Sequence, residues 1–75
     1  MKYQIKLKNI GRNKHSETIV CDYPTLQGVE LRALNEVNKW LLSSTVELIK
    51  HLGGDYSVYV GGFRKVGDVI IEVVK

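Results

Sequence analysis

The sequence predicts a small α+β domain with the element order strand, strand, helix, strand, strand (ββαββ). Three observations support this: polar and apolar residues alternate near the N-terminus, apolar residues recur every three or four positions in the middle of the chain, and alternation returns near the C-terminus. Alternation is typical of a half-buried strand, and the longer spacing is typical of an amphipathic helix. The chain of 75 residues is long enough for one domain with a thin core, so residues 1–75 are expected to form a single unit.

The first two strands form a predicted hairpin. Residues 2–8 alternate strictly, the polar stretch 11–15 contains turn-forming residues, and residues 17–23 alternate again. Because the connection is short, the two strands are expected to pair antiparallel. The residues expected to point inward from this hairpin are Tyr3, Ile5, Leu7, Ile19, Cys21 and Tyr23.

A helix is predicted to follow, with Thr25 as the N-cap because its hydroxyl can accept a hydrogen bond from an amide of the first turn. As one helix, residues 26–52 would be about 40 Å long, whereas a seven-residue strand reaches only about 23 Å. Ser44 and Glu47 have the spacing of a capping box. We therefore expect a main helix to about Leu42, a kink or break, and a second short helix, with one continuous helix as the alternative. The apolar stripe contains Leu26, Val29, Ala33, Val37, Trp40 and Leu41.

The last two strands form a second predicted hairpin. Gly53 and Gly54 are expected to cap the helix. Alternation in residues 56–60 and 69–74 predicts the two strands, and residues 61–65 predict the turn between them. The result is a four-stranded sheet with one long or kinked helix on one face. The predicted core residues are Ile5, Leu7, Ile19, Val37, Trp40, Leu41, Val58, Val60, Ile71 and Val73.

The hairpin–helix–hairpin order resembles the β-grasp arrangement of ubiquitin-like proteins and of the small immunoglobulin-binding domains of bacterial surface proteins. Residues 54–60, Gly-Asp-Tyr-Ser-Val-Tyr-Val, are similar to the entry to the third strand in the second group. The resemblance covers the topology of the whole chain and this one stretch in residues. It implies a sheet in which the first and last strands are central and parallel, and it assigns a functional role to no residue.

Residues that commonly carry catalysis or bind metals are sparse. His15 is expected in a loop and His51 near a helix end, where a histidine complements the helix dipole. Cys21 alternates with core residues and is expected to be a small buried hydrophobe. The glycine pairs follow a helix and join two strands, whereas a phosphate-binding loop runs from a strand into a helix. We therefore expect a non-enzymatic protein that uses neither a cofactor nor a metal.

The composition is mildly basic. Lys and Arg number 11 and Asp and Glu number 8, which permits an acidic partner without demanding one. One cysteine rules out an intramolecular disulfide, which is typical of a reducing compartment, and the N-terminus lacks the apolar core of a signal sequence. The sequence contains no run of 18 apolar residues, so no membrane-spanning segment is predicted. A cytoplasmic protein is the expectation.

Apolar residues outside the predicted core are the strongest functional signal. A four-stranded sheet covers only one helix face, and leftover apolar area is typical of an interface. The alternative is that a kink turns some of these residues inward. The leading prediction is a small protein-interaction module, such as a regulator or inhibitor, that binds a protein partner or a second copy of itself as a homodimer. The predicted interface residues are Leu34, Leu42, Val46, Ile49, Val20, Ile70 and Val74.

Basic residues support a second hypothesis, a nucleic-acid-binding module. Lysines on the outer face of the first strand, an outward aromatic side chain and two basic hairpin loops together could hold single-stranded nucleic acid. The opposing interpretation is a solvated sheet face on which Lys6 or Lys8 pairs with Glu72. The residues of the nucleic-acid hypothesis are Lys2, Lys6, Lys8, Arg12, Lys14, Tyr59, Arg64 and Lys65.

Overall fold

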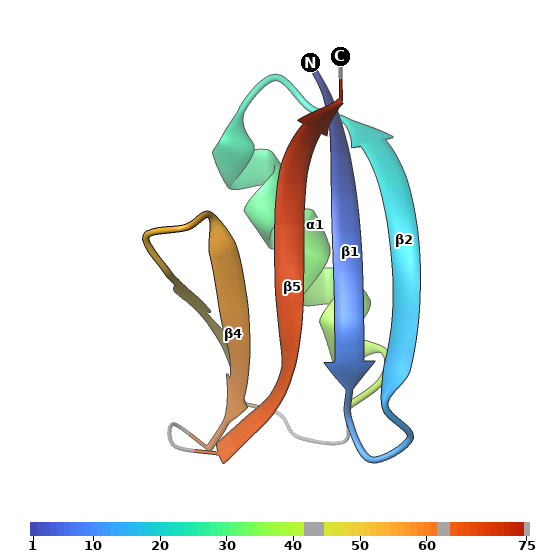
Figure 1. Ribbon diagram of the computed structural model, residues 1–75, viewed down its shortest axis with the longest axis vertical. Helices are drawn as coiled ribbons and strands as arrows, with labels where there is room; N and C mark the ends of the chain where they lie inside the picture. The colour runs from blue at the N-terminus through green and yellow to red at the C-terminus, as the bar shows by residue number, and fades with distance from the viewer. Residues whose placement is uncertain (42–44, 62–63, 75) are drawn as a thin grey trace.

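A sheet with one helix across one face forms the structure, as the sequence predicts (Figure 1). The computed structural model describes residues 1–41, 45–61 and 64–74. Within these residues, five strands form one antiparallel sheet in the order β2-β1-β5-β4-β3. The α+β class is confirmed, and the predicted number of four strands is one too few. The elements are β1 (Lys2–Ile10), β2 (His15–Asp22), α1 (Leu26–Asn38), β3 (Val46–Lys50), β4 (Asp55–Val60) and β5 (Arg64–Val74).

The first hairpin pairs antiparallel, as predicted, with Ile5 opposite Ile19. A β-bulge interrupts the ladder between Leu7 and Ile10, and Asn9 within it has a φ of +54°. Asparagine tolerates this left-handed conformation better than most residues. The bulge changes which face the next side chain takes, so Ile10 joins Ile5 and Leu7 in the core, each of them at most 1% exposed.

The last strand, β5, is the middle strand of the sheet and pairs with β1, with Ile71 opposite Ile5. The β-grasp resemblance implies that the first and last strands are neighbours, and they are. It also implies a parallel pair, whereas these two strands are antiparallel. The reason is the additional strand: three strands follow α1 instead of two, so the last one runs in the opposite direction.

The helix α1 begins at the predicted N-cap. The Thr25 Oγ1 accepts a hydrogen bond from the Gly28 amide at 3.3 Å, which satisfies one of the free amides of the first turn. Residues spaced by four positions then face the sheet, as expected for an amphipathic helix. The buried apolar residues of α1 are Val29, Ala33 and Val37.

The predicted second helical segment is wrong, because residues 46–50 form the strand β3 at the edge of the sheet. Val46 and Leu48 pack against the core, while Glu47 and Ile49 are exposed, which is the alternation of a strand. A short apolar run fits the period of a helix as well as that of a strand, and the pairing of these residues with β4 makes them a strand. The main helix also ends earlier, at Asn38. The predicted limit at Leu42 and the capping-box Ser44 lie outside the described residues, and Glu47 belongs to β3.

The glycine pair predicted to cap the helix instead forms the β3–β4 turn. The His51 amide donates to the Asp55 carbonyl at 2.9 Å, and the Gly54 amide donates to the His51 carbonyl at 3.1 Å. Gly54 has a φ of +91°, a conformation that glycine adopts without steric cost. Because residues 46–50 form a strand and not a helix, the two glycines connect two strands and do not cap a helix.

The core lies between α1 and the inward face of the sheet, and most of its predicted members are in place. Two predictions are wrong: Trp40 is 46% exposed and Val73 is 52% exposed. Trp40 lies beyond the end of α1, so the helical stripe does not orient it, and Val73 lies near the end of β5. The predicted core residues that are buried are Ile5, Leu7, Val37 and Val58, and those that are partly buried are Ile19, Leu41, Val60 and Ile71.

A tyrosine joins the helix to the far side of the sheet. The Tyr56 hydroxyl of β4 donates a hydrogen bond to Glu30 Oε2 of α1 at 2.5 Å. Burial of the ring, followed by this bond to a carboxylate, raises the pKa of Tyr56 above its ordinary value. The phenol therefore stays neutral and remains a donor to α1 at neutral pH.

Glu36 is a charged residue of α1 that is only 8% exposed. Its Oε1 accepts hydrogen bonds from Lys39 Nζ at 3.0 Å and from Arg32 Nε at 3.1 Å. The bond from Lys39, helped by Arg32, lowers the pKa of Glu36 below its ordinary value of 4.5, although burial acts in the opposite direction. The carboxylate is therefore ionised and paired at the end of the helix.

The lowered pKa of Glu36 predicts acid sensitivity. A folded-state pKa below the unfolded value stabilises the protein above the unfolded pKa, and this contribution is lost as the pH falls through the folded value. Glu36→Gln should therefore lose less stability than the wild type between about pH 6 and about pH 3. Urea denaturation across this range measures the difference.

The matched control is Glu47→Gln, which removes a carboxylate that makes no ion pair with a described residue. It should keep the acid dependence of the wild type. Parallel stability curves for Glu36→Gln and the wild type would contradict the assignment.

Candidate functional site

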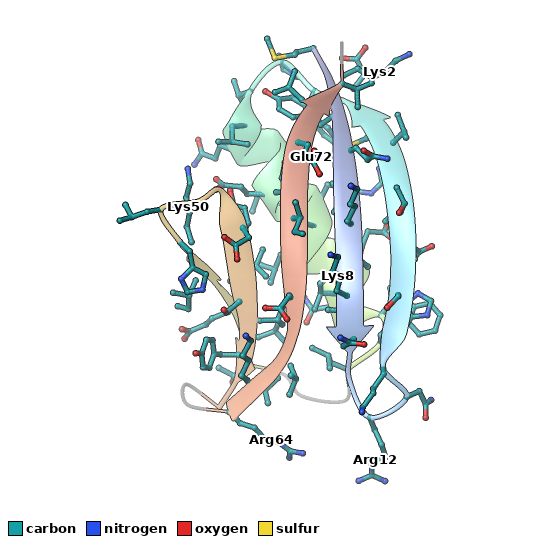
Figure 2. All side chains as sticks on the ribbon, in the orientation of Figure 1. Lys2, Lys8, Arg12, Lys50, Arg64 and Glu72 are labelled. Carbon is teal, nitrogen blue, oxygen red and sulfur yellow. The ribbon has the colours of Figure 1, made fainter. Side chains whose placement is uncertain are left out.

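The face of the sheet opposite α1 is uncovered within the part of the chain that the structure describes. Figure 1 shows α1 behind the sheet, and in Figure 2 Lys8 and Glu72 lie on the near face. We call this surface the open face. By strand register, the outward side chains that form it are Lys2, Gln4, Lys6, Lys8, Thr18, Val20, Asp22, Glu47, Ile49, Asp55, Ser57, Tyr59, Lys65, Asp68, Ile70, Glu72 and Val74.

Four residues of the predicted interface lie on the open face, each paired in register with a polar or charged residue. Val20 is 57% exposed and Ile49 is 43% exposed, and Ile70 and Val74 are half-buried. They come from β2, β3 and β5, so they extend across the sheet and are not confined to one edge. An antiparallel sheet with a solvated face ordinarily carries polar residues there. These four apolar side chains are therefore the feature of this face that requires an explanation.

The other three predicted interface residues do not join them. Leu34 is half-buried on α1, and Val46 points inward from β3 and packs against the core. Leu42 lies outside the described residues. The prediction placed Leu34, Val46 and Ile49 on helices, so the replacement of the second helix by β3 divides the set between the two faces of the sheet.

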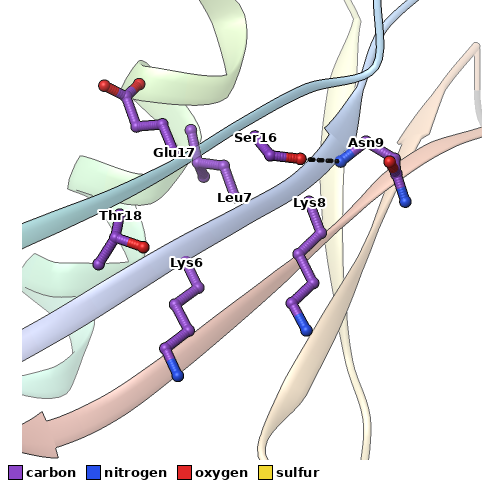
Figure 3. Close-up of a pocket in the computed structure, with 7 residues that line it drawn as sticks. All are labelled: Lys6, Leu7, Lys8, Asn9, Ser16, Glu17 and Thr18. Carbon is purple, nitrogen blue, oxygen red and sulfur yellow. Dashed lines mark hydrogen bonds between the residues drawn. The ribbon is translucent and has the colours of Figure 1, made fainter.

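The lysines of the nucleic-acid hypothesis share the open face with the apolar residues. Figure 3 shows the region of the bulge, a shallow hollow of about 380 Å³ between β1 and β2. There Lys6 and Lys8 extend away from α1 (Figure 3). Lys2, Tyr59 and Lys65 lie on the same face by register. The two hypotheses therefore overlap on the open face.

Carboxylates neutralise much of the charge on the open face. Lys6 Nζ lies 3.0 Å from Glu72 Oε1, so the predicted pairing of Lys6 with Glu72 is confirmed. Lys65 Nζ lies 3.0 Å from Asp68 Oδ1, and this bond raises the pKa of Lys65. Acidic residues occur on β2, β3, β4 and β5, and the five carboxylates of the face outnumber its four lysines, so the face has no excess of positive charge. The acidic members of the open face are Asp22, Glu47, Asp55, Asp68 and Glu72.

The basic hairpin residues lie elsewhere, at one end of the molecule. Figure 2 shows that Arg12 and Arg64 both extend from this end. A cleft of about 500 Å³ lies here, between the β1–β2 turn, the end of α1 and the start of β5. Lys14 belongs to the same β1–β2 turn, in which its amide donates to the Gly11 carbonyl at 3.2 Å. We call this cleft the hairpin-end cleft; its lining residues are Gly11, Arg12, Asn13, Lys39, Trp40, Leu41, Val60, Arg64 and Val66.

Close backbone contacts hold the hairpin-end cleft together. The Gly11 amide donates to the Val66 carbonyl at 3.0 Å. A Cβ on Gly11 would lie 2.8 Å from the Trp40 carbonyl oxygen, so only glycine fits at this junction. The Trp40 indole stacks on the His15 ring, with centroids 3.5 Å apart and planes at 17°. The sequence did not reveal this pair, because Trp40 matched the helical stripe.

The remaining reactive side chains make local contacts. His51 Nε2 lies 2.6 Å from Ser57 Oγ, which links the β3–β4 turn to β4. His15 Nε2 lies 3.2 Å from Glu17 Oε1. Cys21 carries a free thiol, is half-buried and packs against the core, as predicted for an inward-facing residue of β2.

Comparisons with known proteins add no relative. The chain matches no protein-family model, no curated protein and no solved structure. The helix in the described part of the chain, α1, has 13 residues, and no described helix has the length and apolar character needed to cross a membrane. The functional argument therefore depends on the surfaces of this chain.

Proposed function

We propose that this protein is a small protein-interaction module and that the open face is its binding surface. The observation that carries the proposal is that four apolar side chains, Val20, Ile49, Ile70 and Val74, are distributed across the open face from one edge strand to the other. Exposed apolar area on a small domain is typical of a surface that is covered by a partner. In this proposal the protein acts by occupying a partner's surface, as a regulator or inhibitor does, and not by catalysis.

The charges of the open face favour a protein partner over nucleic acid. Nucleic-acid binding depends on an excess of positive charge that displaces counterions from phosphates. Here the carboxylates of the neighbouring strands balance the lysines, and Lys6 and Lys65 are engaged in ion pairs. A mixture of both signs around apolar residues is suited to a protein surface of mixed charge.

The partner that this face fits is a second copy of the chain. Lys2, Lys6 and Lys8 lie on β1, on one side of the central strand, while Asp55 and Glu47 lie on β4 and β3, on the other side. A two-fold axis along β5 would place β1 of one copy over β4 of the other, and such an interface is complementary to itself. The apolar residues of β5 would then meet their counterparts.

The size of the open face is adequate for a dimer. Figure 1 looks onto this face along the shortest axis of the molecule, and the other two axes extend over 33 and 22 Å. The projected area is about 700 Å², close to the roughly 800 Å² that each partner contributes to an interface of standard size. Covering the second face of the sheet would also compensate for the thin core of a small domain.

The proposal places the protein in the cytoplasm. Its support is the free thiol of Cys21, the one cysteine of the chain, since a reducing compartment keeps an unpaired thiol reduced.

Self-association is the property that tests this function. Sedimentation equilibrium over a concentration series should show a dimer for the wild type. Val20→Asp and Ile70→Asp should each raise the dimer dissociation constant by at least about ten-fold, because an unpaired carboxylate would be buried in an apolar contact. Circular dichroism establishes that each variant is folded.

The matched control is Leu31→Asp. Leu31 is 59% exposed, as Val20 is at 57%, but it lies on α1, on the other side of the sheet. The Leu31→Asp variant should have the same dimer dissociation constant as the wild type. A wild type that is monomeric at millimolar concentration, or a Leu31→Asp variant that is impaired as much as Val20→Asp, would contradict the proposal.

A further inference from the structure

The hairpin-end cleft differs in charge from the open face. Three of its lining residues are cationic, Arg12, Lys39 and Arg64, and none of the described residues that line it is acidic. Lys39 forms an ion pair with Glu36, whereas neither Arg12 nor Arg64 makes an ion pair with a described residue. Both guanidinium groups are therefore available, and their planar donor geometry matches phosphate.

The end of α1 weakens this positive field only slightly. A helix C-terminus carries about half of a negative elementary charge. The carbonyls of Val37 and Asn38 already accept the amides of Trp40 and Leu41, at 3.0 and 3.4 Å. The two guanidinium charges of Arg12 and Arg64 exceed this partial charge, so an anion is favoured in the cleft.

The floor of the cleft supplies an apolar and aromatic surface. Leu41, Val60 and Val66 line it beside Trp40. One partner of the Trp40 ring is His15, stacked at 3.5 Å, yet Trp40 remains 46% exposed. A planar aromatic ligand can extend this stack, as bases do on the aromatic side chains of proteins that bind single strands.

We propose that the hairpin-end cleft binds a nucleotide unit. Arg12 and Arg64 bind its phosphate, and its base stacks beside Trp40. The volume of about 500 Å³ lies within the range of small-ligand sites, so the cleft holds one unit and not an extended strand. The unit belongs either to a free nucleotide or to a single-stranded oligonucleotide. This site is independent of the open face. In this proposal nucleotide binding takes place at the hairpin end and not at the lysines of β1.

The single tryptophan of the chain makes the site directly observable. Trp40 fluorescence is titrated with a mononucleotide and, separately, with a short single-stranded oligonucleotide. We expect quenching by at least one of them. Arg12→Gln and Arg64→Gln should each weaken binding by roughly ten-fold, as expected for a lost charge-assisted bond. In the double variant, the slope of log K against log salt concentration for oligonucleotide binding should become less negative by about 0.7, because the contact with one phosphate is removed.

The matched control is Lys2→Gln with Lys8→Gln, which removes two cations from the open face. It should bind as the wild type does, and so should Val20→Asp, so that failure of the dimer and failure of this site can be told apart. Quenching by the mononucleotide would show that a free nucleotide is sufficient as the ligand of the cleft. Quenching by the oligonucleotide alone would show that the ligand is a single strand. The proposal is overturned by the absence of quenching with both ligands, by an equal loss in the lysine variant, or by equal binding of an oligoglutamate peptide.

Discussion

Ile5→Ala should lower the free energy of unfolding by about 2–5 kcal/mol, the largest single effect expected in this protein. Ile5 is fully buried on β1, opposite Ile19 of β2 and Ile71 of β5. The substitution removes buried methyl and methylene groups and leaves a cavity where three strands meet. Small domains have total stabilities at the low end of the 5–15 kcal/mol range, so the variant should be partly unfolded at room temperature.

Urea denaturation followed by circular dichroism measures this effect. Leu31→Ala is the control, because Leu31 is exposed on α1 and alanine favours helices, so its stability should change by no more than about 0.5 kcal/mol. If Ile5→Ala were as stable as Leu31→Ala, the assignment of the inward face of β1 would be wrong.

Gly67→Ala should destabilise the protein by about 1–3 kcal/mol, although alanine is the better residue in a strand. A Cβ at this position of β5 would lie 2.5 Å from Ile10 Cδ1 and 3.1 Å from Ile10 Cα, and also 3.2 Å from the Asn9 carbonyl oxygen. The side-chain atom can move away, but the backbone atoms of β1 can move only if the two strands separate. The loss should appear as a lower midpoint in urea.

Gly53→Ala is the matched control for this prediction. The nearest atom to a Cβ at Gly53 is Asp55 Oδ1, at 3.4 Å, which is an ordinary contact with a mobile side chain. Its stability should stay within about 0.5 kcal/mol of the wild type. Equal midpoints for the two alanine variants would show that β1 and β5 do not approach each other as closely at the bulge.

Local signals explain what the sequence predicts correctly. The alternation from Tyr3 to Leu7 depends only on the contrast between two faces, and the Thr25 cap depends on one hydroxyl and one nearby amide. Both are decided within a few residues. For that reason the first hairpin and the start of α1 agree with the structure.

The missed features depend on distant partners. Val46–Lys50 fits either a helix or a strand, and its pairing with β4 decides the outcome. The bulge at Asn9 changes the face of Ile10, and Gly67 accommodates that change from another strand. A glycine inside a strand is a known sign of close backbone approach, so Gly67 was the available signal for this contact.

The candidate site could be predicted only in part, for the same reason. Alternation alone predicts that Val20, Ile70 and Val74 are outward apolar residues. Ile49 joined them on the open face only because β3 is a strand. The helical spacing of Trp40 predicts a core residue, whereas its place beside His15 follows from the end of α1 at Asn38.

Contact between two copies of the open face is the central claim, and one NMR measurement tests it most directly. A sample of mixed isotope-labelled and unlabelled protein gives nuclear Overhauser effects that arise only between different chains. The predicted result is a set of intermolecular effects from the methyl groups of Val20, Ile49, Ile70 and Val74. Intermolecular effects from Leu31 and Leu34 of α1 alone, or none at all at millimolar concentration, would contradict the claim.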